Sequence, residues 1–118
     1  MATPRHTFTI HRDSDWELTF SAPTIDGVTV DLEDAELDDI KVEIFDDEHD
    51  DTAVATCSTV ASANNSVITV AAGGASATMF FAKEDLADVE FGSNHHNMSF
   101  IWDGVERTFL HGPLIKKR

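Results

Sequence analysis

The sequence is poor in cysteine and in basic residues, and it has no long apolar run. Cys57 is the single cysteine of 118 residues, which excludes an internal disulfide and a zinc site built of cysteines alone. Eight Lys and Arg stand against 22 Asp and Glu, a net charge of −14. This balance argues against nucleic-acid and anionic-membrane binding, because both depend on basic side chains.

The apolar runs are also too short for a membrane. None approaches the roughly 18 residues that suggest a membrane-spanning helix, and residues 1–15 lack the apolar stretch of a secretory signal. The chain does have material for one core, since 42% of it is apolar, with eight Phe and two Trp. No repeat or linker divides it, so we expect residues 1–118 to form a single domain.

Apolar and polar residues alternate with the period of a half-buried strand in several segments. These are residues 8–10, 16–20, 28–32, 40–44 and 98–102. Asp103-Gly104 predicts a hairpin, and a second hairpin is expected between residues 8–10 and 16–20. The pattern predicts an all-β fold, either an antiparallel β-sandwich or a partly open barrel, with at most one short helix, at residues 83–88.

Apolar positions in these segments, and in the expected strands at residues 67–70 and 77–82, predict the core. They are Phe8, Ile10, Trp16, Leu18, Phe20, Val42, Ile44, Val70, Phe80, Phe100 and Trp102. Because both tryptophans fall on the apolar side, their positions favour core packing over a carbohydrate-stacking platform.

Acidic residues are concentrated in one segment, since residues 31–51 hold twelve acids and one base, Lys41. Two solvated turns that flank a strand explain such a run, and a cation site or an electrostatic docking patch is the alternative. Residues 46–51 have the composition of a calcium loop without its glycine and terminal glutamate, so weak binding of a divalent ion stays open. The basic residues 116–118 form either an exposed tail or a contact for an acidic stretch on a neighbouring subunit. The candidate interaction residues are Asp46, Asp47, Glu48, Asp50, Asp51, Lys116, Lys117 and Arg118.

No motif with catalytic spacing is present. There is no Gly-x-Ser-x-Gly turn, and Cys57 lies among small residues, as a buried and inert thiol does. His95 and His96 are adjacent, so on a strand they point to opposite faces and do not chelate one ion together. We therefore expect no enzyme, no cofactor and no metal site.

Two stretches resemble a small β domain of tailed-bacteriophage and prophage structural proteins. The first is HTFTIHRDSDWELTF, residues 6–20, followed by Ile25-Asp26-Gly27 and Val30-Asp31-Leu32. The second runs from Trp102-Asp103-Gly104 to Leu110-His111-Gly112-Pro113-Leu114. Here Asp13 follows Arg12 where those domains carry a glycine, and Glu33-Asp34-Ala35 replaces their Leu-Thr-Gly. The resemblance implies a structural role in a tail, neck or baseplate, without catalysis.

The expected function is therefore that of a virion component that assembles with itself or with other virion structural proteins. It would be made in the host cytoplasm, and nucleic acid and membranes are not expected partners. The alternative is a ligand- or carbohydrate-binding β-sandwich module. An acidic inhibitor that imitates nucleic acid fits less well, because eleven of the fourteen net negative charges lie within 21 residues.

Overall fold

The computed structural model describes all residues except 1–3, 26, 35–36 and 48, and the described chain forms strands, turns and loops without a helix. The strands are β1 (Phe8–His11), β2 (Trp16–Ser21), β3 (Thr24–Ile25), β4 (Val28–Thr29), β5 (Leu37–Phe45), β6 (Ala55–Ser58), β7 (Val67–Val70), β8 (Ser76–Phe81), β9 (Gly92–Trp102) and β10 (Val105–Lys117). The predicted all-β class is confirmed.

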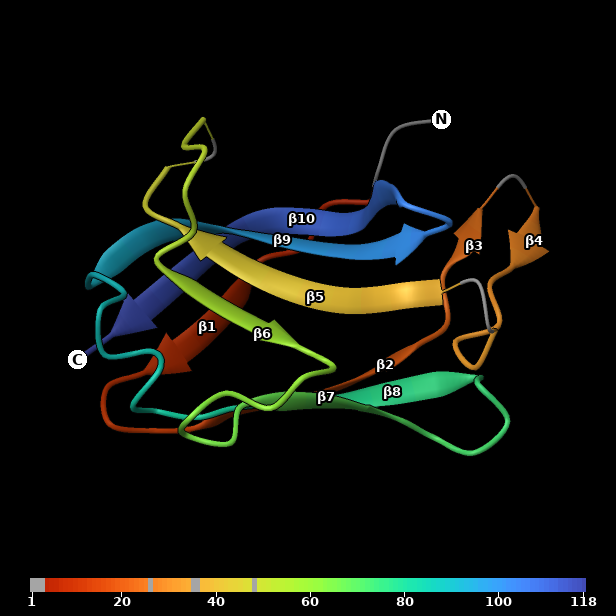
Figure 1. Ribbon diagram of the computed structural model, residues 1–118. Coiled ribbons are helices and arrows are strands. Elements are labelled where there is room, and N and C mark those ends of the chain that lie inside the picture. The colour runs from red at the N-terminus through yellow and green to blue at the C-terminus, as the bar shows by residue number, and fades with distance from the viewer. Residues whose placement is uncertain (1–3, 26, 35–36, 48) are drawn as a thin grey trace.

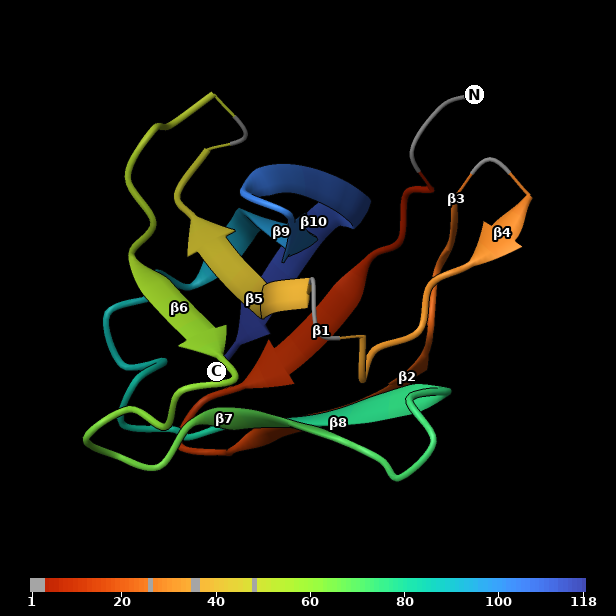
Figure 2. The same cartoon turned by 45° about the vertical axis from the view of Figure 1, so that its right-hand side comes forward.

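Two sheets pack against each other. Five strands in the order β1-β10-β9-β5-β6 form a curled sheet, and three strands in the order β2-β8-β7 form the second layer below it (Figures 1 and 2). The short hairpin β3–β4 stands out from the side of both layers as an arm. The architecture is that of a β-sandwich whose larger sheet curls toward a partly open barrel.

The longest hairpin, β9–β10, forms where the sequence predicts it. Val105 pairs with Trp102, and the two residues between them, Asp103 and Gly104, have φ values of 48° and 78°. Two positive φ angles in a two-residue turn match the right-handed twist of the flanking strands. β9 is the central strand of the curled sheet, and β10 lies beside it. The pairing of β10 with β9 contains a bulge between Thr108 and Leu110.

The prediction of a hairpin between residues 8–10 and 16–20 is wrong. β1 pairs in parallel with β10, with Phe8 opposite Leu114, while β2 pairs antiparallel with β8 in the other sheet. The two strands thus lie in different layers. Their apolar faces meet across the sandwich, where the Phe8 and Trp16 rings lie 5.4 Å apart. This parallel pair is the departure from the expected antiparallel sheet.

The predicted core is confirmed in its main part. Ile10, Trp16, Val42, Ile44 and Phe100 are buried, and Phe8, Leu18, Phe20, Val70 and Trp102 are half-buried and pack against them.

Phe80 is the exception in the predicted core, because it is half-buried outside the core cluster while its neighbours Met79 and Phe81 are fully buried within it. The cause is the register of β8, in which Phe81 lies opposite Trp16. Residues directly opposite in an antiparallel pair share one face of the sheet, so Phe81 follows Trp16 into the core.

Residues 82–91 form successive turns rather than the short helix that residues 83–88 suggested. Leu86 N donates to Ala82 O at 3.2 Å, and Val89 N donates to Leu86 O at 3.1 Å. Leu86 and Val89 are both buried, so the segment seals one end of the sandwich. In the part of the chain that is described, no helix has the length and apolar character to cross a membrane.

Candidate interaction surface

The acidic loop between β5 and β6 is exposed, as its composition predicts. Asp46, Asp47, Asp50 and Asp51 are on the surface, and Glu48 lies outside the described residues. The loop uses two of these carboxylates internally, because Asp47 N donates to Asp50 Oδ2 at 3.2 Å and His49 N donates to Asp47 Oδ1 at 3.0 Å.

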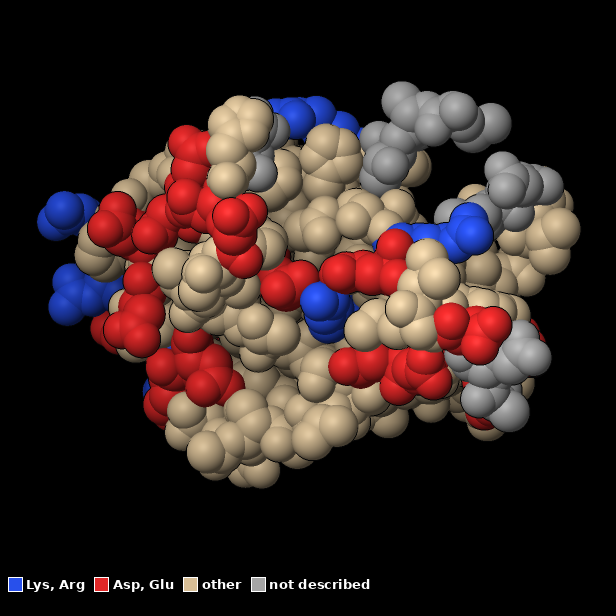
Figure 3. Space-filling view, turned by 45° about the horizontal axis from the view of Figure 1, so that its top comes forward, with Lys and Arg blue, Asp and Glu red and all other residues tan. Residues whose placement is uncertain are grey.

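Acids earlier in the segment fasten neighbouring turns. Asp38 Oδ2 accepts a hydrogen bond of 3.0 Å from Gly104 N, at the tip of the β9–β10 hairpin. Asp39 Oδ1 accepts bonds from the backbone and the hydroxyl of Thr59, at 3.2 and 2.7 Å. Figure 3 shows acidic side chains in several groups across one face of the molecule. The described acids of residues 31–51 are therefore distributed over several turns and strands.

Lys41, the base within the acidic segment, is engaged by its neighbours. Its Nζ lies 3.0 Å from Glu106 Oε1 and 3.2 Å from Glu43 Oε1. Ser99 Oγ also donates to Glu106 at 3.0 Å. The bonds from Lys41 and Ser99 lower the pKa of Glu106, so this carboxylate stays ionised in the ion pair.

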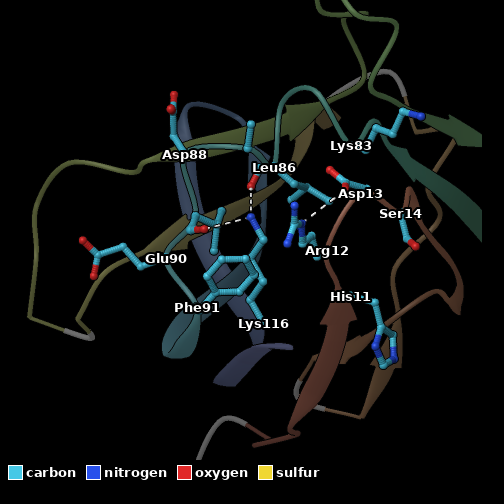
Figure 4. Close-up of a pocket in the computed structure, with 12 residues that line it drawn as sticks. His11, Arg12, Asp13, Ser14, Lys83, Leu86, Asp88, Glu90, Phe91 and Lys116 are labelled. Carbon is cyan, nitrogen blue, oxygen red and sulfur yellow. Dashed lines mark hydrogen bonds and ion pairs between the residues drawn. The ribbon is translucent and has the colours of Figure 1, made fainter. Parts of the chain in front are cut away.

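The basic end of the chain is not a free tail. β10 continues to Lys117, and Lys116 is buried with its Nζ donating to Leu86 O and Val89 O, both at 2.9 Å (Figure 4). The Phe91 ring lies 5.2 Å from the Lys116 ammonium and 4.8 Å from the Arg118 guanidinium. Lys117 and Arg118 are exposed. The sequence could not show this, because three basic residues in a row read as a solvated tail.

A groove of about 540 Å³ lies beside Lys116, between the β1–β2 turn and residues 82–91. Its wall holds charges of both signs, including the Arg12–Asp13 ion pair at 3.3 Å. Figure 4 shows Asp88 and Glu90 pointing away from the Lys116 ammonium. The groove therefore offers no single charge for a ligand to match.

An apolar groove of about 200 Å³ separates the β3–β4 arm from the β9–β10 hairpin. It is lined by Val28, Thr29, Val30, Phe100, Trp102 and Arg107, and is called the arm groove below. Val28 is 69% exposed and Val105, which lies opposite Trp102, is 56% exposed. Val28 thus shares the groove with Trp102, and Val105 lies beside Trp102 in the hairpin. The sequence gives no signal for this groove, because alternation indicates which face of a strand points inward and does not indicate a projecting arm.

Asp85 organises the loop after β6. Its carboxylate accepts hydrogen bonds from Ser62 Oγ at 2.6 Å, Ser66 Oγ at 2.5 Å and Asn64 Nδ2 at 2.8 Å. These bonds lower the pKa of Asp85. The arrangement satisfies a carboxylate with hydroxyl and amide donors, so it serves to fasten residues 62–66 to residues 82–86.

Cys57 is buried beside this loop, and its Sγ lies 3.5 Å from Phe80 O. Burial raises the pKa of the thiol to about 12, and the charge of Asp85 adds to the effect. A thiol held in its protonated form is a poor nucleophile, as the sequence predicts for this residue.

Metal binding finds no support in the geometry of the described residues, where no group of three His, Cys, Asp or Glu side chains is placed to hold an ion. The chain matches no protein-family model, and a search of curated proteins finds no match.

Proposed function

We propose that this protein is a structural component of a phage or prophage virion, in the tail, neck or baseplate, and that it works by protein–protein assembly. The partners are copies of itself or other virion structural proteins. The arm groove carries the proposal, because it is lined by the exposed Val28 and by Trp102, and the exposed Val105 lies directly opposite Trp102 in the β9–β10 hairpin.

Single exposed apolar residues are normal on a soluble protein, whereas a continuous apolar surface marks a contact site. The arm groove meets this description, with a buried aromatic floor at Phe100 and a half-buried Trp102 in its wall. Arg107 lines the same groove and adds one positive charge. Apolar contact would supply most of the affinity, and the charge would set the orientation of the partner.

Open sheet edges offer a second means of contact. β1 and β6 end the larger sheet, and β2 and β7 end the smaller one. A sheet that does not close leaves backbone donors and acceptors at its edges, where another strand can pair. The basic end contributes less than the sequence suggested, because Lys116 is used inside the fold.

The experiment compares Val28→Asp with Val60→Asp. Both valines are exposed, at 69% and 75%, but Val60 does not line the arm groove. Light scattering after size exclusion, at high protein concentration and with the products of neighbouring genes, measures assembly. We expect Val28→Asp to abolish assembly and Val60→Asp to leave it unchanged. A strict monomer that binds none of those products contradicts the proposal.

A ligand-binding module is the second candidate, because Trp102 and Arg107 line one small groove. An aromatic ring beside a charged donor is a common way to hold a sugar or another small polar ligand. Tryptophan fluorescence, titrated with a panel of oligosaccharides, separates the two candidates. A saturable change that Trp102→Phe weakens, together with strict monomeric behaviour, would favour the ligand-binding function.

A further inference from the structure

Residues 4–7 run parallel to β10 and are fixed to β9 and β10 by three hydrogen bonds. His6 N donates to His111 O at 2.9 Å, and His111 N donates to Pro4 O at 3.2 Å. His6 O in turn lies 2.7 Å from Nε2 of His96 on β9. These residues are called the N-terminal latch below.

The latch sits close to the backbone of β10. It passes over Gly112, which lies opposite His96 in the β9–β10 register and has a φ of 152°. A Cβ at position 112 would collide with the carbonyl oxygen of His6. Glycine at this position therefore lets the His6 carbonyl reach the imidazole of His96.

His96 is fully buried, and its Nδ1 has no hydrogen-bond partner among the residues that the structure describes. A carbonyl oxygen only accepts hydrogen bonds, so Nε2 carries the proton of the neutral ring and Nδ1 is bare. Phe8 packs edge-on against the ring, with the two centroids 4.9 Å apart. A proton added at Nδ1 would thus place a charge at a buried atom that no described acceptor meets, which is costly.

The groups around His96 add to this cost. His6 on the latch, His95 on β9 and His111 on β10 all disfavour the charged form of the ring. Arg5 pairs with His111 through its backbone, in a parallel bridge. From β1 and β5, the residues at this level are the uncharged Phe8 and Ile44. Asp46 and Asp47 line a groove with Arg5 and His95, and the His95 ring centroid lies 6.3 Å from that of His96.

We propose that His96 makes the N-terminal segment an acid-sensitive latch, which is closed near neutral pH and lifts from β10 when the ring takes up a proton. Lifting residues 4–7 uncovers the imidazole, so that the charged ring reaches water. It also frees the segment that leads into β1, an edge strand of the larger sheet.

The direction of the pH dependence follows from the two states of the ring. In the closed state burial lowers the pKa of His96 to about 4, against an ordinary value of 6.5. The open state therefore binds more protons between these values, and closure weakens as the pH falls through that window. Between pH 7.5 and 4.5 the closing equilibrium falls by a factor on the order of 100.

The test measures amide hydrogen exchange by NMR at His6 and His111, whose N–H groups hold the latch. Protection factors, which correct for the intrinsic effect of pH on exchange, are compared at pH 7.5 and 4.5 with that of Val42 in the core. We expect those of His6 and His111 to fall about a hundredfold, while that of Val42 falls much less. Equal protection of His6 and His111 at both pH values would overturn the proposal.

The decisive variant is His96→Gln, because glutamine keeps an N–H donor near His6 O and does not titrate. We expect its latch to stay closed at pH 4.5. His11→Gln makes the same substitution at an exposed histidine of β1 and should open like the unmodified protein. If His96→Gln does not fold, the ring nitrogen shifts of His96 in the unmodified protein replace it. A proton on Nδ1 at pH 7.5, or opening without protonation of this ring, would defeat the proposal.

Discussion

The ammonium group of Lys116 donates a hydrogen bond of 2.9 Å to the carbonyl oxygen of Leu86, which lies 30 residues earlier in the chain. A second bond of the same length reaches Val89 O. Residues 82–91 form turns rather than a helix and are held in part by the bond from Val89 N to Leu86 O, so donors from elsewhere in the fold add to it. Lys116 supplies such donors from β10 and thereby holds residues 82–91 over the end of the sandwich.

Replacing Lys116 by Met should lower the free energy of unfolding by about 2–4 kcal/mol, because it leaves two buried carbonyl oxygens without a charged donor. Urea denaturation measures the change. Lys117→Met is the matched control, since Lys117 is exposed on the same strand, and we expect little effect from it. Equal effects of the two substitutions would show that the bonds to Leu86 and Val89 contribute little.

The hydrogen bonds to the Asp85 carboxylate predict that the protein loses stability in acid. Because hydrogen bonds from Ser62, Ser66 and Asn64 lower its pKa in the folded state, the unfolded chain takes up the proton first. The stability that Asp85 contributes is complete well above its ordinary pKa of 3.8 and is lost as the pH falls through the folded value. Asp85→Asn should therefore be less stable at pH 7 and show a flatter fall below pH 5, as measured by thermal unfolding at a series of pH values. Asp88→Asn, at an exposed site, serves as the control.

Two adjacent phenylalanines test the register of β8. Phe81 is fully buried opposite Trp16, and Phe80 is half-buried on the other face. Phe81→Ala should cost about 3–5 kcal/mol of unfolding free energy, the range for a large aromatic side chain in a core. Phe80→Ala should cost less than half of that. A larger loss at Phe80, measured by denaturant unfolding, would mean that β8 pairs one residue out of the observed register.

The sequence predicts a strand best where its alternation is unbroken. Ile40, Val42 and Ile44 alternate with polar residues, and all three are buried in β5. Met79, Phe80 and Phe81 are all apolar, so the sequence does not show which of them point into the core. That is decided by the pairing of β8 with β2, a distant part of the chain. The Asp103-Gly104 turn was predictable because a two-residue hairpin turn needs positive φ angles, and Asp-Gly is one of the few residue pairs that adopt them readily.

Partners distant in sequence were not predictable. Alternation in residues 8–10 and 16–20 shows that each segment buries one face, and it does not show whether they share a sheet. The same limit applies to Lys116, whose partners Leu86 and Val89 act through backbone oxygens that have no sequence signature. The arm groove arises from the placement of two hairpins, so no single segment carries its pattern.

The parallel pairing of β1 with β10 has a consequence for synthesis on the ribosome. Residues 8–11, made early, find their partners only when residues 114–117 have emerged. The smaller sheet and the β5–β6 pair are available long before that moment, whereas one edge of the larger sheet stays unfinished. Contacts between such distant segments slow folding and leave apolar surface open in the meantime. A nascent chain stalled before residue 114 should consequently expose Phe8 and Ile10, and it is at this stage that chaperones would find the protein.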